Sequence, residues 1–215
     1  RSTPDRSSAA SDVYKRQYNM FAAIPGVKVV VPSNPYDAKG LLMSAIQEDN
    51  LVVFSEDKTL LGQKGNVPEE PYTIEIGKAN VTREGDDLTI VAIGKMVAVA
   101  EETAEKLAED QVSVEVIDLR SVSPWDKETV LDSVKKTGRL IVIDESNPQC
   151  NIAGDVASVI GDVGFDYLDG PIKKVTAPDT PVPFAANLEA AYMPNADKVL
   201  DIASELIDDL KKANA

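Results

Sequence analysis

Residues 88–119 read LTIVAIGKMVAVAEETAEKLAEDQVSVEVIDL, and this stretch decides the fold class. Its first six residues are apolar except for Thr89, which is typical of a strand covered on both faces. A helix is predicted over residues 95–109, because apolar residues recur there at helical spacing while Glu102 and Lys106 can pair outside. A second strand is predicted at 112–119. This strand–helix–strand order predicts an α/β fold with a mainly parallel sheet flanked by helices.

The alternation continues toward the C-terminus. Ser123-Pro124-Trp125-Asp126 is predicted to begin a second helix, with a serine cap, a proline at the first helical position and an acid three residues after the cap. That helix ends at Thr137-Gly138, and a strand follows at 139–143, apolar from Leu140 onward. A further helix, a short strand at 172–175 and a terminal helix complete the pattern. Residues 88–215 are therefore expected to form one domain.

A shorter unit of the same type lies upstream, at 18–56. It contains a valine-rich strand at 28–32, a helix that begins at Asn34-Pro35, and a strand at 51–54. Residues 57–87 are rich in glycine, proline and charge, so we expect an extended connection in which 72–76 alone is strand-like. Residues 1–17 have no apolar periodicity, and we interpret them as a foreign or mistranslated leader in preference to a native arm.

Composition excludes several functional classes. The chain has 22 Lys and Arg against 36 Asp and Glu, a net charge of −14, which argues against nucleic-acid binding. No apolar run approaches the roughly 18 residues that a membrane-spanning helix needs. The absence of histidine excludes a His-based catalytic triad and a His-ligated metal within this sequence. The single cysteine, Cys150, fits a reducing compartment and is interpreted as unreactive.

Few residues look catalytic. The dinucleotide and P-loop glycine motifs do not occur, and we interpret Gly62-Gln63-Lys64-Gly65 as a turn in preference to a phosphate loop. Asp144-Glu145 follows the strand at 139–143, where ligands of open α/β sheets often bind. We nevertheless interpret this pair as a solvated loop, because no second group is visibly placed for acid–base chemistry. Trp125 is expected to be a packing residue.

Longer motifs carry a resemblance to a known family. They are YNMFAAIPGVKVVVPSNPYDAKGLL at 18–42, VIDLRSVSP at 116–124, TGRL at 137–140 and VTAPDTPVP at 175–183. In this order they resemble the β subunit of the 2-oxoacid dehydrogenase E1 component, of the acetoin dehydrogenase or pyruvate dehydrogenase type. The first motif is most similar to the acetoin dehydrogenase branch. Transketolase and deoxyxylulose-phosphate synthase share the C-terminal domain but resemble the chain less.

The resemblance assigns parts of the chain to domains and places the catalytic groups outside the chain. Residues 18–56 would be the end of a thiamine-diphosphate pyrimidine-binding domain, and 88–215 a transketolase C-terminal-like domain. The parent enzyme would contain two α and two β subunits, use thiamine diphosphate with Mg²⁺, and pass an acyl group from a 2-oxoacid or acetoin to lipoamide on E2. The activating glutamate would lie upstream and the Mg-diphosphate site in the α subunit. The resemblance thus implies an N-terminally truncated β subunit without catalytic or cofactor-binding residues, inactive alone.

The resemblance also implies a cation site. A structural potassium ion would be held by backbone carbonyls of Ala45, Ile46 and Asn50, with Glu48 where an aspartate is usual; a water-capped helix end is the alternative.

The implied protein partners are the E1 α subunit, a second β subunit and the basic peripheral-subunit-binding domain of E2. Asp208 and Asp209 are expected to contact the last of these, and solvated helix faces are the alternative. The implied location is cytoplasmic, or the mitochondrial matrix in a eukaryote, with no nucleic-acid or membrane partner. The competing interpretations are an acidic, non-catalytic α/β interaction domain and the C-terminal part of a transketolase-like enzyme.

Overall fold

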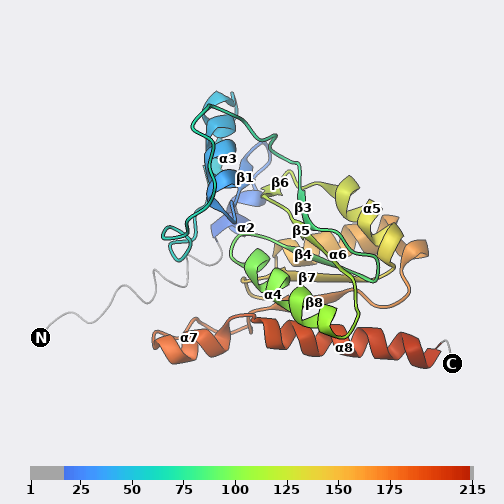
Figure 1. The fold of residues 1–215 in the computed structure, drawn as a ribbon. Helices are drawn as coiled ribbons and strands as arrows, with labels where there is room; N and C mark the ends of the chain where they lie inside the picture. The colour runs from blue at the N-terminus through green and yellow to red at the C-terminus, as the bar shows by residue number, and fades with distance from the viewer. Residues whose placement is uncertain (1–16, 214–215) are drawn as a thin grey trace, which may run out of the picture.

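The computed structural model describes residues 17–213 and the side chains of residues 18–207 (Figure 1). The N-terminal unit contains α2 (Gln17–Ala22), β1 (Lys28–Val30), α3 (Pro35–Gln47) and β2 (Val52–Phe54). The remaining elements are β3 (Asn80–Arg83), β4 (Leu88–Ala92), α4 (Met96–Glu109), β5 (Val114–Asp118), β6 (Ser121–Ser123), α5 (Lys127–Thr137), β7 (Leu140–Asp144), α6 (Ile152–Val163), η1 (Phe165–Tyr167), β8 (Lys173–Thr176), α7 (Ala186–Tyr192) and α8 (Ala196–Ala213). This alternation confirms the predicted α/β class.

The larger sheet has five strands in the order β3-β5-β4-β7-β8. The strands β5, β4, β7 and β8 are parallel to their neighbours, whereas β3 pairs with β5 in the antiparallel direction. Every residue of β4, β5 and β7 is buried. The prediction of a mainly parallel sheet is therefore confirmed, and the carboxyl ends of its parallel strands meet at one edge.

Helices cover both faces of this sheet (Figure 1). The apolar side chains of α4 and α8 form one core cluster with Ile90 and Ile143, and those of α5 and α6 form a second cluster with Val91 and Val142. Neighbouring residues of one strand thus belong to different clusters, as the alternation of side chains along a strand requires. Within residues 17–213, no helix combines the length and apolarity that crossing a bilayer requires.

A smaller sheet joins the N-terminal unit to the rest of the chain. Its strand order is β2-β1-β6, with β1 parallel to β2 and antiparallel to β6. Because β6 lies between β5 and α5 in the sequence, the chain leaves the larger sheet to pair with β1 and then returns. Tyr18, Val29 and Val31 share the second core cluster with α5 and α6. The two units therefore share a continuous core, and independent folding of 88–215 stays a prediction.

Of the two predicted N-terminal helix caps, one is confirmed and the other is wrong. Asn34 caps α3 as predicted, since its side chain accepts a hydrogen bond of 2.9 Å from the Asp37 amide. At α5 the cap is Asp126, which accepts from the Thr129 amide at 3.2 Å. The prediction of a Ser123 cap was wrong, because pairing with β1 holds Ser123 in β6, where its hydroxyl donates to the Val27 carbonyl.

The segment between the two units is bonded to α3. Residues 72–76, expected to be strand-like, form no strand. Instead the Tyr72 ring stacks on Tyr36 with 4.6 Å between centroids, and the Ile74 amide donates to the Gly40 carbonyl at 3.2 Å. The Ser44 hydroxyl donates to the Ile74 carbonyl at 2.5 Å. The amide and carbonyl of Ile74 are thus bonded to α3 in place of a neighbouring strand.

The expected connection also contains a strand of the larger sheet. β3 lies within 57–87 and forms the edge next to β5. The turn that leads from β3 to β4 passes close to β5 at Gly85, where an added Cβ would lie 2.1 Å from the Val114 carbonyl carbon and 2.3 Å from the Glu115 nitrogen. Glycine is required here by this close backbone approach.

We expect Gly85→Ala to lower the free energy of unfolding by about 2–3 kcal/mol, because the methyl group meets backbone of a central strand that cannot move freely. Gly62→Ala is the matched control, since nothing lies within 4 Å of its added Cβ. The control should change stability by no more than about 1 kcal/mol. Urea denaturation of the whole chain measures both; equal effects of the two variants would contradict the packing of this turn.

Candidate functional site

Polar side chains gather where the N-terminal unit meets the carboxyl ends of β5 and β7. Asp118 ends β5 and Asp144 ends β7, and both carboxyl groups are fully buried. The Ser33 hydroxyl donates to Asp118 at 2.5 Å, and the Tyr18 hydroxyl donates to Asp144 at 2.5 Å. Each acid therefore binds a residue of the N-terminal unit through a charge-assisted or short hydrogen bond.

The Asp118 cluster contains one cation. The Arg120 guanidinium donates to Asp37 at 2.6 Å, and the Arg120 amide donates to Asp118 at 2.9 Å. Asp37 is itself buried in the first turn of α3, where its other oxygen accepts from the Asn34 side chain at 2.8 Å. Arg120 has a left-handed backbone with φ of 57°, which is uncommon for a residue with a side chain.

Burial raises the pKa of Asp118 to about 7. The Ser33 hydrogen bond, the Arg120 amide and the Arg120 charge act in the opposite direction, while Asp37 raises the pKa further. Desolvation dominates because the only nearby guanidinium is already bound to Asp37 in the described structure. A carboxyl of this kind can hold or release a proton near neutral pH.

The Asp144 cluster joins α2 to the loop after β7. Besides Tyr18, Asp144 accepts from the Ser146 amide at 2.9 Å, and the Ser146 hydroxyl accepts from the Asn19 side chain at 2.8 Å. Asn19 also accepts from the Ile152 amide at the start of α6. Burial raises the pKa of Asp144 and of Tyr18. Our interpretation of Asp144 as a solvated loop residue was wrong, because α2 packs over it.

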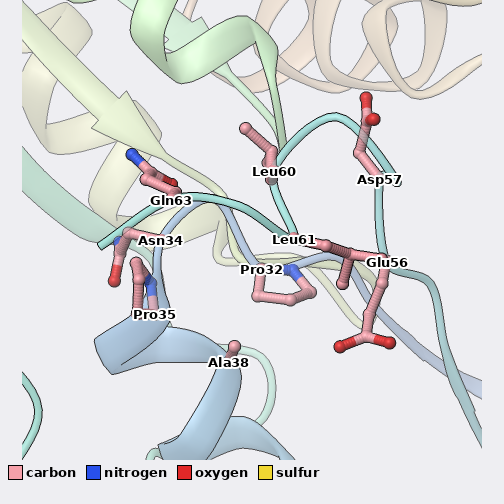
Figure 2. A pocket seen from close by; sticks show the side chains of 9 residues that line it. All are labelled: Pro32, Asn34, Pro35, Ala38, Glu56, Asp57, Leu60, Leu61 and Gln63. Carbon is pink, nitrogen blue, oxygen red and sulfur yellow. The ribbon is translucent and has the colours of Figure 1, made fainter. Parts of the chain in front are cut away.

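Figure 2 shows a hollow beside the start of α3. Its volume is about 220 Å³, and one wall is formed by Pro32, Asn34, Pro35 and Ala38. The opposite wall comes from the loop after β2 and contains Glu56, Asp57, Leu60, Leu61 and Gln63. The carboxylates of Glu56 and Asp57 point away from each other in Figure 2, so they do not converge on one ligand atom.

A larger open hollow of about 640 Å³ lies on the other side of the junction, between α2, the β6–α5 turn and the start of α6. Trp125 is buried there and donates its indole N–H to Asp155 at 2.6 Å, while the Lys127 ammonium lies 5.7 Å from its ring centroid. The expectation that Trp125 is a packing residue is confirmed. Cys150 is exposed at the rim of this hollow.

The described residues do not fit a Mg-diphosphate group. Among them, no group of three or more His, Cys, Asp or Glu side chains could hold a metal ion. The hollow in Figure 2 carries two carboxylates, which would repel a diphosphate. We therefore derive no chemical step through thiamine diphosphate from this chain.

The predicted potassium ligands lie together at the end of α3. The Ala45 carbonyl accepts from the Glu48 amide at 3.4 Å, and Ile46 is exposed. The Glu48 carboxylate is paired with the Lys28 ammonium and also accepts from the Asn50 side chain at 3.1 Å. An ammonium thus already neutralises the carboxylate at this helix end. Potassium binding by these four residues stays a prediction.

Asp208 and Asp209 belong to α8, but their side chains lie outside the described part of the structure. Their contact with a partner therefore stays a prediction. Sequence reasoning missed Ser33, Asp118 and Arg120 as a cluster. The available signal was the acid that ends the apolar run in VIDLR, since a carboxyl at the end of a covered strand is buried whenever another segment packs over that edge.

Comparison with known proteins agrees with this architecture. Residues 77–199 match the family model for the transketolase C-terminal domain, and residues 8–64 match that for the transketolase pyrimidine binding domain. The second match begins inside the range 1–17 that we interpreted as a leader; residues 1–16 lie outside the described structure. The chain belongs to the transketolase C-terminal domain family, preceded by sequence of the pyrimidine binding domain family.

Two curated relatives give the level of sequence similarity. The chain is 52% identical over 199 residues to the acetoin:2,6-dichlorophenolindophenol oxidoreductase subunit beta of Bacillus subtilis, covering 93% of the chain and 58% of that relative. It is 47% identical over 190 residues to the pyruvate dehydrogenase E1 component subunit beta of the same organism, covering 88% and 58%. The chain therefore spans just over half the length of these relatives, and the resemblance to E1 β subunits is confirmed.

A solved structure supports the fold. The split gene transketolase, described as an inactive beta4 tetramer, superimposes with a TM-score of 0.75 and 24% identity, over 90% of this chain and 62% of that chain.

The junction predicts the effect of removing one hydroxyl group. Tyr18→Phe should lower the free energy of unfolding by about 1–3 kcal/mol at pH 7.5, because it leaves the buried Asp144 carboxyl with one fewer donor. Since the Tyr18 hydrogen bond lowers the pKa of Asp144 and so favours its ionised form, the loss should shrink as the pH falls through the titration of Asp144. Tyr167→Phe is the control on an exposed ring and should change stability by less than about 0.5 kcal/mol. A loss that is equal for both variants would refute the contact.

Proposed function

We propose that the chain is part of the β subunit of a thiamine-diphosphate-dependent E1 component that acts on acetoin. The observation that carries this proposal is the 52% identity over 199 residues to the acetoin:2,6-dichlorophenolindophenol oxidoreductase subunit beta. Pyruvate dehydrogenase E1 and 2-oxoisovalerate dehydrogenase subunits follow at 47% and 42% identity. The cofactor supplies the carbanion chemistry in such enzymes, and the protein supplies binding and orientation.

The role that we propose for these residues is structural. In this proposal the N-terminal unit contributes the last strands and helix of the pyrimidine binding domain, and the junction acids fix its orientation on the C-terminal domain. Tyr18 and Ser33 provide that link through Asp144 and Asp118. Correct placement matters for catalysis because reacting groups tolerate errors of well under about 1 Å.

Exposed apolar side chains of the N-terminal unit mark a face that we propose is covered by further protein, either the remainder of the pyrimidine binding domain or another subunit. Leu42, Ile46 and Leu51 are 46%, 72% and 67% exposed, and they lie on or next to α3 and β2. β2 pairs with β1 on one side, and no described strand pairs with its other side. A surface with this much apolar area and an open strand edge is typical of a face that packs against more protein.

The proposal includes the partners and ions that the family resemblance implies. We propose an α subunit and a second β subunit in the assembly, docking of the basic E2 domain through Asp208 and Asp209, and a potassium ion held by Ala45, Ile46, Glu48 and Asn50. We propose a cytoplasmic location, or the mitochondrial matrix if the source is a eukaryote. The cofactor pair would be thiamine diphosphate and Mg²⁺, bound mainly outside the described residues.

The substrate proposal is tested in the complete enzyme. The full-length β subunit, co-expressed with its α subunit, should reduce 2,6-dichlorophenolindophenol faster with acetoin than with pyruvate or 2-oxoisovalerate. We expect a ratio of kcat/KM values of at least about 100, as expected when a pocket lacks partners for a substrate group. A higher kcat/KM with pyruvate would overturn the acetoin proposal and keep the E1 assignment; no turnover with any of the three would overturn both.

The cofactor proposal makes a separate prediction for the polypeptide of residues 1–215. Calorimetry with thiamine diphosphate and Mg²⁺ should show no binding at concentrations up to about 1 mM, because the described residues offer no metal cluster and the hollow beside α3 is acidic. Micromolar affinity of this polypeptide would show that a diphosphate site was overlooked.

A further inference from the structure

The turn that links β5 to β6 holds the N-terminal unit at three points. The Asp118 carboxyl accepts from the Ser33 hydroxyl, which lies just after β1. The Arg120 carbonyl accepts from the Val31 amide at 2.8 Å, and the Arg120 guanidinium donates to Asp37 in α3. All three contacts come from residues 118–120, so a small change in this turn acts on β1 and α3 together.

The charges in this turn do not balance when both acids are ionised. Two buried carboxyl groups, Asp37 and Asp118, face one guanidinium, and that guanidinium contacts Asp37. Asp118 is then a buried carboxylate with neutral donors, the Ser33 hydroxyl and the Arg120 amide. Burying a charge without a partner of opposite sign costs several kcal/mol, whereas the protonated acid avoids most of this cost.

Within the described part of the chain, the strands on either side of Asp118 place uncharged residues beside it. On one side it is in register with Asn80 of β3, and on the other side with Ala92 of β4. The charged groups that act on Asp118 are Asp37, from α3, and Arg120, from its own turn. Its protonation therefore depends mainly on whether the N-terminal unit keeps water away from it.

We propose that the Ser33–Asp118 contact is a proton-dependent latch that holds β1 and α3 against the five-stranded sheet. With Asp118 protonated, the charges of Asp37 and Arg120 balance each other and the junction is closed. With Asp118 ionised, the junction carries an excess negative charge that only contact with water can relieve. Opening of residues 28–47 therefore becomes easier as pH rises. The inference does not depend on the proposed acetoin chemistry.

The direction and range of the effect follow from proton linkage. The closed state holds the proton up to about pH 7, whereas a solvated aspartate has a pKa of 3.8. Between these values the open state binds fewer protons, so the equilibrium constant for opening rises by up to about tenfold per pH unit. Above about pH 7 both states are ionised and the dependence levels off.

Hydrogen exchange of the whole chain tests this latch. After correction for intrinsic exchange rates, the opening constant of peptides within 28–47 should rise at least about tenfold between pH 5.5 and 7.5, and that of the β4 peptide at 88–92 should rise much less. In Asp118→Asn, which keeps the shape of the side chain and cannot ionise, the 28–47 constant should change by less than about threefold over the same range. The same rise in wild type and Asp118→Asn would overturn the latch.

Two further variants keep the test decisive. Ser33→Ala removes a hydrogen bond that favours the ionised form, so the pH dependence should persist and extend about 0.5–1 pH unit higher. If Asp118→Asn does not fold, an unchanged profile of Ser33→Ala overturns the proposal by itself. Asp162→Asn removes an exposed acid of α6 and should give the wild-type profile. An Asp162→Asn variant that flattens the profile would show a general charge effect and contradict a local latch.

Discussion

Packing of the N-terminal unit over the carboxyl ends of β5 and β7 removes two aspartates from water. Asp118 and Asp144 are both fully buried, and each accepts a 2.5 Å hydrogen bond from a side chain of that unit. Buried carboxyl groups without hydrogen-bond partners would cost more than the packing gains. The position of the N-terminal unit is therefore fixed by apolar contacts and by the hydrogen bonds of Ser33 and Tyr18 to these acids, which leave Oδ2 of Asp144 without a described partner.

The apolar part of this constraint comes from the sheet itself. Its central strands are buried on both faces, and the helices α5 and α6 share the second face with Tyr18, Val29 and Val31. The crossing of β6 to pair with β1 then requires the sharp turn at Arg120, whose φ is 57°. That turn positions the Asp118 carboxyl and the carbonyl and guanidinium of Arg120, which bind Ser33, Val31 and Asp37. The polar contacts at the junction therefore depend on the path of the chain from β5 to β6.

Local pattern predicted the elements that need only local information. The strands predicted at 88–93 and 139–143 correspond to β4 and β7, and Asn34 caps α3. The failures came from partners distant in sequence. Ser123 pairs with β1 almost a hundred residues away, and Asp144 is covered by Tyr18 at a separation of 126 residues. A local sequence pattern cannot predict these long-range partners, because burial at a strand end is decided by tertiary packing.

The family resemblance supplied what physical reasoning from the residues could not. It placed the chain among E1 β subunits, whereas residue chemistry alone indicated an acidic α/β protein without a complete active site. In the described residues, the polar clusters at Asp118 and Asp144 join the two units of the chain. Burial at this junction raises the pKa of both acids.

The ionisation of Asp118 in the folded chain tests this account most directly. Carbon-13 NMR of the side-chain carboxyl, assigned by its disappearance in Asp118→Asn, gives the midpoint of its titration. The account predicts a midpoint near pH 7, because burial under the N-terminal unit raises the pKa of this group to about 7. A midpoint near 4 would show a solvated carboxylate and would contradict the packing of the N-terminal unit over the end of β5.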